Sequence, residues 1–154
     1  MCLRLFKDWA KHMAVRNIVC YKFMREITMD VGDGEKHKEI TIAIRSPYMQ
    51  YEYELGKEYE SKLINDAGRV EEGFHSFPNF IDCWNKMESF IDTSYAPWGY
   101  KNLYVYKCII PENSFYYNGD YCGVKSMASD RIIIVEKCKL TWFKKLKIIL
   151  NEIF

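Results

Sequence analysis

The chain has 154 residues, a formal net charge of +1, and an apolar fraction of 49%. This length predicts one domain, residues 1–154, with a sizeable core. The apolar fraction excludes a disordered chain, and the small net charge argues against a general nucleic-acid-binding protein. No apolar run approaches the roughly 20 residues of a membrane-spanning helix, and the charged N-terminal segment does not resemble a signal peptide.

The cysteine spacing bears on metal binding and on location. Six cysteines are spread irregularly and no Cys-x-x-Cys pair occurs, so we expect no zinc site of that kind and no other metal site. Free thiols without a secretion signal are typical of a cytoplasmic protein, which is the location that we expect. Cys83, Cys108 and Cys138 fall in apolar segments, where a reduced cysteine packs as a small hydrophobe.

The first half of the chain predicts one helix followed by strands. Apolar residues recur every three or four positions in residues 3–14, which predicts an amphipathic helix. Residues 17–24 are rich in β-branched and aromatic side chains and predict a strand. A polar loop with two glycines predicts a hairpin across residues 26–44. Tyrosine and glutamate alternate over residues 51–55, which predicts a half-exposed strand, and residues 62–72 predict an irregular connection.

The middle of the chain predicts a helix that begins near Pro78. Its apolar face is formed by Phe80, Cys83, Trp84, Met87 and Ile91. Proline is favoured in a first helical turn, so we expect the N-cap at Ser76 or Phe77.

The second half predicts two strong strands and a last helix. Residues 103–110 and 130–140 predict the strands, and Asn118-Gly119 predicts a turn between them. Residues 142–154 predict a helix that is apolar on one side and basic on the other, a pattern shared by helices that dock on their own sheet and by membrane-surface helices. The whole pattern favours an α+β fold, with a mostly antiparallel sheet of about six to seven strands and N-terminal, central and C-terminal helices.

The corner Gly73-Phe74-His75-Ser76 is the candidate ligand site, because it leads from a strand into a helix. Backbone N–H groups at a helix start attract phosphate and carboxylate groups. The alternative is that His75 and Ser76 only satisfy that helix end. The sequence has no P-loop and no Gly-x-Gly-x-x-Gly motif, and it does not support a Ser-His-acid triad.

Two segments resemble small uncharacterised proteins of phages and mobile elements. They read YELGKEY…GFHSF and LYVYKCIIP…YYNG…ASDRIIIVEK, and the resemblance covers residues 51–137. It carries no known activity. It implies a small protein encoded by a phage or mobile element.

The layout is also similar to the ADP-ribosyltransferase fold. In this resemblance Lys22 stands near the family's strand arginine, Ser76 near its serine, and Asp130 near its catalytic glutamate. The resemblance implies NAD or ADP-ribose as the ligand. Lysine lacks the planar fork of arginine, aspartate is shorter than glutamate, and Ala128 replaces the first acid of the pair, so it implies binding without turnover.

Three hypotheses remain open. The leading one is a cytosolic binding protein without enzymatic activity that acts stoichiometrically on a host or phage macromolecule, most plainly a protein, for example by inhibiting a defence system. The second is an NAD- or ADP-ribose-binding protein or ADP-ribosyltransferase, with Lys22, His75, Ser76 and Asp130 as ligand contacts. The third, binding to nucleic acid or imitation of it, is disfavoured by the scattered charges, and association with a membrane is disfavoured as well.

Overall fold

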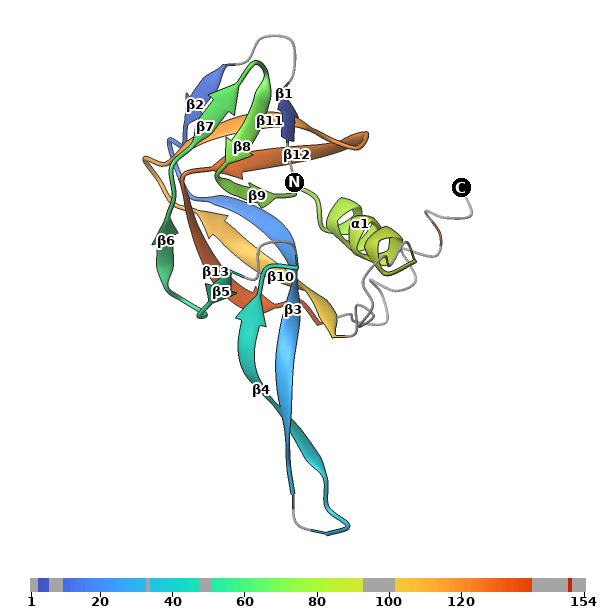
Figure 1. The fold of residues 1–154 in the computed structure, drawn as a ribbon. Coiled ribbons are helices and arrows are strands. Elements are labelled where there is room, and N and C mark those ends of the chain that lie inside the picture. Colours follow the sequence, from blue (N-terminus) through green and yellow to red (C-terminus); the bar gives the residue numbers. More distant parts are fainter. Residues whose placement is uncertain are drawn as a thin grey trace.

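The computed structural model describes residues 3–5, 10–32, 34–47, 51–92, 102–139 and 150. Within these residues, thirteen strands form two antiparallel sheets, and one helix lies to the side (Figure 1). The far end of the long β3–β4 hairpin projects beyond the other strands (Figure 1).

The first sheet is built around a long pairing between β3 and β10, and we call it the β3 sheet. Its strand order is β5-β4-β3-β10-β13-β6. The strands are β3 (Ile18–Val31), β4 (Lys38–Arg45), β5 (Glu52–Tyr53), β6 (Glu58–Glu60), β10 (Leu103–Ile110) and β13 (Arg131–Lys137). The β3–β10 register runs without interruption from Ile18 opposite Ile110 to Arg25 opposite Leu103.

The second sheet is built around the β11–β12 hairpin, and we call it the β11 sheet. Its order is β7-β8-β1-β11-β12-β9, and β2 pairs with β11 beside β1. The strands are β1 (Leu3–Leu5), β2 (Lys11–Met13), β7 (Ile64–Asp66), β8 (Arg69–Glu72), β9 (Phe74–Ser76), β11 (Phe115–Tyr121) and β12 (Val124–Ser129).

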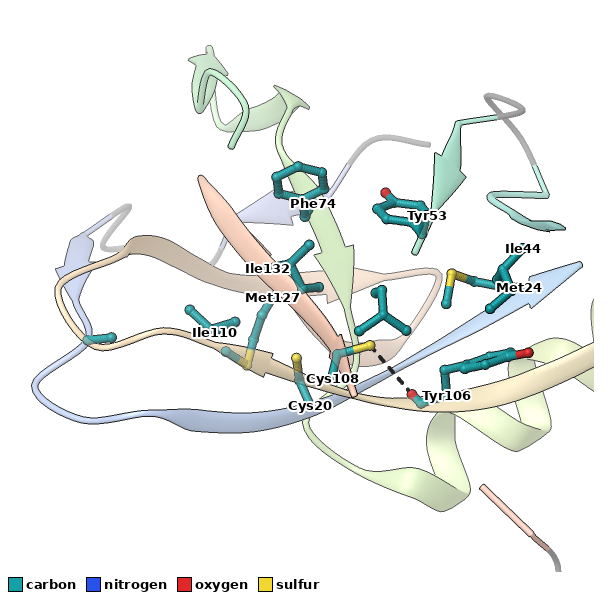
Figure 2. Close-up of a cluster of buried hydrophobic side chains, with 12 residues drawn as sticks. Cys20, Met24, Ile44, Tyr53, Phe74, Tyr106, Cys108, Ile110, Met127 and Ile132 are labelled. Atoms are coloured by element: carbon teal, nitrogen blue, oxygen red, sulfur yellow. Dashed lines mark hydrogen bonds between the residues drawn. The ribbon is translucent and has the colours of Figure 1, made fainter. Parts of the chain in front are cut away.

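Alternation along β3 gives the β3 sheet two buried faces. Successive strand residues point to opposite faces, and Cys20 and Met24 enter the core cluster that also contains Phe74 of β9 (Figure 2). Phe23, on the other face, packs in a second cluster with helix α1. The β3 sheet is therefore covered by β9 on one face and by the helix on the other.

Helix α1 (Phe80–Asp92) begins immediately after the corner that the sequence singles out. Cys83 and Met87 are buried against Phe23 and the neighbouring strand residues. The N-cap is Asn79, whose side-chain oxygen accepts a 2.8 Å hydrogen bond from the Ile81 N–H. The expected cap at Ser76 or Phe77 is wrong, because β9 extends to Ser76 and the next residue bridges to β3.

The predicted α+β class is wrong, because the described chain is mostly β and contains one short helix. Residues 3–14, predicted as a helix, contain β1 and β2 instead. Both strands pair with β11, at Leu5 opposite Gly119 and His12 opposite Tyr116. These hydrogen bonds to a distant strand outweigh the local helical period. The predicted C-terminal helix, residues 142–154, lies outside the described residues except for Leu150.

Two turns also differ from the prediction. The expected irregular connection, residues 62–72, holds the β7–β8 hairpin, with positive φ at Ala67 and Gly68. Asn118 and Gly119 lie within β11, and the turn falls at Cys122-Gly123. There the Asp120 carboxylate accepts a 2.7 Å hydrogen bond from the Gly123 N–H, which stabilises the later turn.

The strand predicted at 51–55 is reduced to the two residues of β5, and two sheets with thirteen described strands replace the predicted single sheet of about six to seven. Several other expectations for the described segments are confirmed. The strand at 17–24 belongs to β3, the hairpin at 26–44 is β3–β4, and the central helix is present. The strands at 103–110 and 130–140 are β10 and β13. No helix in the described part of the chain is long and apolar enough to cross a membrane.

Candidate binding cavity between the two sheets

A cavity of about 350 Å³ opens where the edge of the β3 sheet approaches β8 and β9. Its lining comes from three separate stretches of the sequence: Lys22 of β3, residues in the range 46–61, and residues 71–75. The volume falls at the lower end of the range for small-ligand pockets. It is large enough for one long side chain or a small molecule.

One wall of the cavity is aromatic. Tyr51, Tyr53 and Phe74 line it, and Tyr59 supports it from behind, with its ring centroid 5.1 Å from that of Tyr53. The Tyr51 and Tyr53 centroids are 5.0 Å apart, and those of Tyr53 and Phe74 are 6.3 Å apart. The Tyr59 hydroxyl accepts a 2.7 Å hydrogen bond from the Glu54 N–H. The wall is therefore held in place before any ligand arrives.

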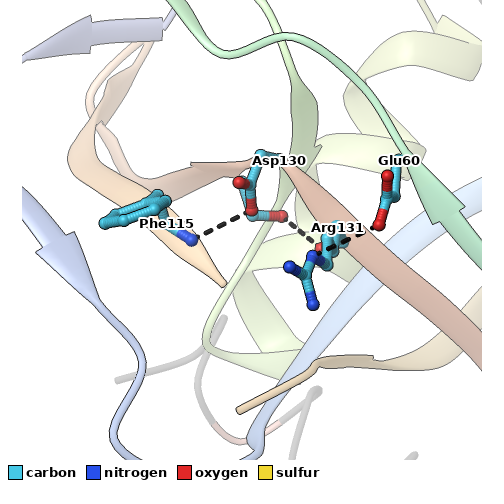
Figure 3. A network of polar contacts seen from close by, with 5 residues as sticks. Glu60, Phe115, Asp130 and Arg131 are labelled. Carbon is cyan, nitrogen blue, oxygen red and sulfur yellow. Dashed lines mark hydrogen bonds and ion pairs between the residues drawn. The ribbon is translucent and has the colours of Figure 1, made fainter. Parts of the chain in front are cut away.

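The rim of the cavity is acidic. Glu60, Glu71 and Glu72 line it and all three are exposed. Glu60 forms a 3.5 Å ion pair with the Arg131 guanidinium (Figure 3). The ion pairs of the described residues include neither Glu71 nor Glu72. The rim therefore presents negative charge to the cavity.

Lys22 lies at the inner end of the cavity. Its ammonium donates a hydrogen bond to the backbone carbonyl oxygen of His75. Burial lowers the pKa of Lys22, and the nearby thiols of Cys108 and Cys20 oppose that shift. A partly buried ammonium needs a partner, and here the partner is the backbone carbonyl oxygen of His75 in β9.

His75 lies beside Lys22 and is neutral at pH 7. Burial lowers its pKa to about 3, and the positive charge of Lys22 acts in the same direction. The His75 Nδ1 atom is buried and has no hydrogen-bond partner among the described residues. The imidazole therefore carries no charge at pH 7, and its Nδ1 atom is closed to solvent.

Gly73 shapes the corner next to the cavity. Its φ is +139°, a region that residues with a side chain rarely adopt. A Cβ atom at this position would lie 2.7 Å from Leu63 Cδ1 and 3.2 Å from the Ser129 carbonyl oxygen. The corner therefore requires glycine for both its backbone conformation and its packing.

The other two predicted contacts do not line the cavity. Ser76 is completely buried beside the Cys20 thiol. The Asp130 carboxylate accepts a 2.9 Å hydrogen bond from the Phe115 N–H (Figure 3). The Asp130 carbonyl accepts a 2.8 Å bond from the Ser61 N–H. The structure thus brings Lys22 and His75 into one cavity with each other and leaves Ser76 and Asp130 outside it.

Sequence reasoning missed most of the cavity. The sequence predicts Tyr51 and Tyr53 only as strand residues and Glu71 and Glu72 only as part of an irregular connection, although it places Phe74 in the candidate corner. The alternation of tyrosine and glutamate at 51–55 was the available signal, because it places rings on one face of a strand with acids nearby. This strand and residues 71–75 are separated in the sequence, so the sequence alone does not show that they line the same cavity.

The described residues contain no group of three or more His, Cys, Asp or Glu side chains that could hold a metal ion. No family model, no curated protein and no solved structure matches this chain. Its function is therefore argued from the geometry of the cavity itself.

Proposed function

We propose that the protein is a stoichiometric binding protein, and that its cavity receives a protruding group of a macromolecular partner, most plainly a protein. The observation that carries this proposal is an open, preformed cavity of about 350 Å³ with an aromatic wall. Aromatic pockets that receive one anchoring side chain carry much of the binding energy at protein interfaces. A wall of packed rings loses little conformational freedom when such a group enters.

The polar groups around the cavity favour binding over catalysis. A general acid or base must reach its substrate with a pKa near the working pH. The Lys22 ammonium is hydrogen-bonded to a backbone carbonyl, and the pKa of His75, about 3, is far below neutral. Ser76 is buried, and the Asp130 carboxylate is hydrogen-bonded to a backbone N–H of β11.

The sequence suggests the class of partner and the cellular compartment for this function. Resemblance to phage and mobile-element proteins suggests a host or phage macromolecule as the partner, with inhibition of a defence system as one outcome. The five described cysteines are free, which suits a reducing compartment such as the cytoplasm.

The proposal is tested by blocking the cavity. Ser61 lines the cavity and is partly exposed, so Ser61→Trp fills its mouth. Ser89, an exposed residue of α1, provides the matched control Ser89→Trp. A peptide selected from a displayed library against the wild-type protein is titrated against all three proteins. We expect Ser61→Trp to lose binding and Ser89→Trp to keep it, and equal binding by both variants would contradict the proposal.

A nucleotide such as NAD or ADP-ribose is the second candidate, because Lys22 and His75 share a cavity with a stacking surface. Thermal unfolding with each nucleotide tests it. A ligand at 100 times its dissociation constant adds about 2.7 kcal/mol of stability, which raises the Tm by roughly 2–4 °C per kcal/mol. A rise that Ser61→Trp abolishes would favour this candidate, and unchanged melting would exclude it.

A further inference from the structure

The cavity carries a charge pattern that selects among ligands. We propose that it binds a cationic group, namely the ammonium, methylated ammonium or guanidinium of a basic side chain on the partner. This inference rests on the proposed binding function, which it makes more specific. Its evidence is the combination of an aromatic wall with an acidic rim, since either feature alone would fit several classes of ligand.

The aromatic wall suits a cation because the face of an aromatic ring is negative. An ammonium within about 6 Å of a ring centroid is attracted to that face. Tyr59, which packs against the aromatic wall, already makes such a contact, because Lys57 Nζ lies 5.3 Å from its ring centroid. Tyr51 is 46% exposed, so its ring remains open to an incoming side chain.

The acidic rim also attracts cations. Three carboxylates line the cavity, and only Glu60 has a cationic partner among the described ion pairs. Complementary charge at the edge of a binding site mainly raises the association rate and selects between partners. A basic side chain that approaches the Tyr51 ring therefore meets a rim that carries three carboxylates.

The residues at the inner end of the cavity do not reverse the preference for a cationic ligand. Lys22 is the only cation among the described lining residues, burial lowers its pKa, and its ammonium already donates to the His75 carbonyl. His75 is neutral because its pKa is about 3. A phosphate in this cavity would therefore face three carboxylates with one partly satisfied ammonium. We expect cations to bind best, neutral analogues less well and anions least.

The test compares probes that differ only in charge. NMR titrations detect binding as weak as millimolar, and the probes are one short peptide carrying lysine, trimethyllysine or acetyllysine, together with ADP-ribose. We expect the trimethyllysine and lysine peptides to bind roughly three- to thirtyfold tighter than the acetyllysine peptide, which is the range of one to several cation–π contacts. An increase in salt concentration should reduce this difference in affinity between the cationic and the acetyllysine peptides.

Variants separate the charge of the rim from the shape of the cavity. Glu71→Gln combined with Glu72→Gln should weaken the cationic peptides and leave the acetyllysine peptide unchanged. Glu88→Gln, at an exposed position of α1, is the control and should change neither. Each binding event counts only if Ser61→Trp abolishes it.

The two proposals fail in different ways. Tighter binding of acetyllysine or ADP-ribose in the cavity would overturn the inference of a cationic ligand and leave the binding function standing. Selected peptides whose binding Ser61→Trp does not affect would overturn both.

Discussion

Lys22 of β3 and the His75 carbonyl of β9 are joined by a hydrogen bond between the two sheets, at the inner end of the cavity. The bond connects the β3 sheet to the β11 sheet. One residue pair further on, Tyr21 and Phe77 exchange two backbone hydrogen bonds of 2.8 Å. The corner that the sequence singles out is therefore the junction of the two sheets.

Lys22→Met should alter the dependence of stability on alkaline pH. Burial places the native pKa of Lys22 below its ordinary value of 10.5. Between these two values the unfolded chain binds a proton that the native protein does not, so this group makes stability rise with pH. Urea unfolding at several pH values should show that the rise is smaller in Lys22→Met than in wild type. Parallel curves would show that Lys22 is not desolvated.

His75→Gln should alter the acid side of the stability profile. The native pKa of His75 is about 3 against an ordinary value of 6.5. The unfolded chain takes up a proton between these values and the native protein does not, so stability falls as pH decreases, with a slope of up to about 1.4 kcal/mol per pH unit. The difference between wild type and His75→Gln isolates this contribution from that of the carboxylates. A constant difference from pH 6.5 to pH 3 would contradict the burial of His75.

Removal of Glu26 should be strongly destabilising. Its buried carboxylate accepts hydrogen bonds from the hydroxyls of Tyr106, at 2.5 Å, and Thr41, at 3.1 Å, and pairs with Lys137 at 3.0 Å. Glu26→Ala leaves the buried Tyr106 hydroxyl without its acceptor, and an unsatisfied buried polar group costs about 1–3 kcal/mol. Glu26→Gln keeps the acceptor oxygen and should cost less. Urea unfolding gives both values, and equal losses would show that only the volume of the side chain matters.

Gly73→Ala should destabilise the fold more than Gly123→Ala. Both residues have positive φ, but a Cβ at Gly73 would meet Leu63 and the Ser129 carbonyl, whereas nothing lies within 4 Å of one at Gly123. Backbone strain alone costs about 1–3 kcal/mol, and the collision adds to it at Gly73. Thermal unfolding compares the stabilities of the two variants. A Gly123→Ala variant less stable than Gly73→Ala would contradict the packing of the corner.

Asn79→Ala should weaken helix α1 at its start. The loss of an N-cap side chain costs about 0.5–2 kcal/mol, and the Asn79 side chain bonds the Ile81 N–H. Ser76→Ala, at the last residue of β9 and three residues before Asn79, should leave helix content unchanged. Circular dichroism during thermal unfolding compares the two. A larger effect at Ser76 would restore the cap that the sequence alone suggested.

The sequence predicts β3, β10 and β13 and misses the two N-terminal strands, for a physical reason. β3, β10 and β13 carry enough β-branched and aromatic residues for local pattern to identify them. β1 and β2 are three residues each, and their strand conformation depends on pairing with β11 more than one hundred residues later. Local propensity holds no information about that pairing.

Local sequence pattern is limited in the same way as a guide to the cavity. The sequence places Lys22 and His75 among the candidate contacts, and the structure finds both in one cavity. Ser76 is predicted both from the corner and from the resemblance, and Asp130 from the resemblance alone; their side chains turn to Cys20 and to the Phe115 N–H. A cavity formed by three separate segments of the sequence becomes visible only when the sheets are assembled.

The most direct test of the central claim is the affinity of a library-selected peptide for Ser61→Trp compared with Ser89→Trp, measured by calorimetry. If the cavity between the sheets is the binding site, the Ser61→Trp variant loses most of its affinity while the Ser89→Trp variant matches wild type. If both variants keep the affinity of wild type, the protein binds its partner elsewhere and the account of the cavity is wrong.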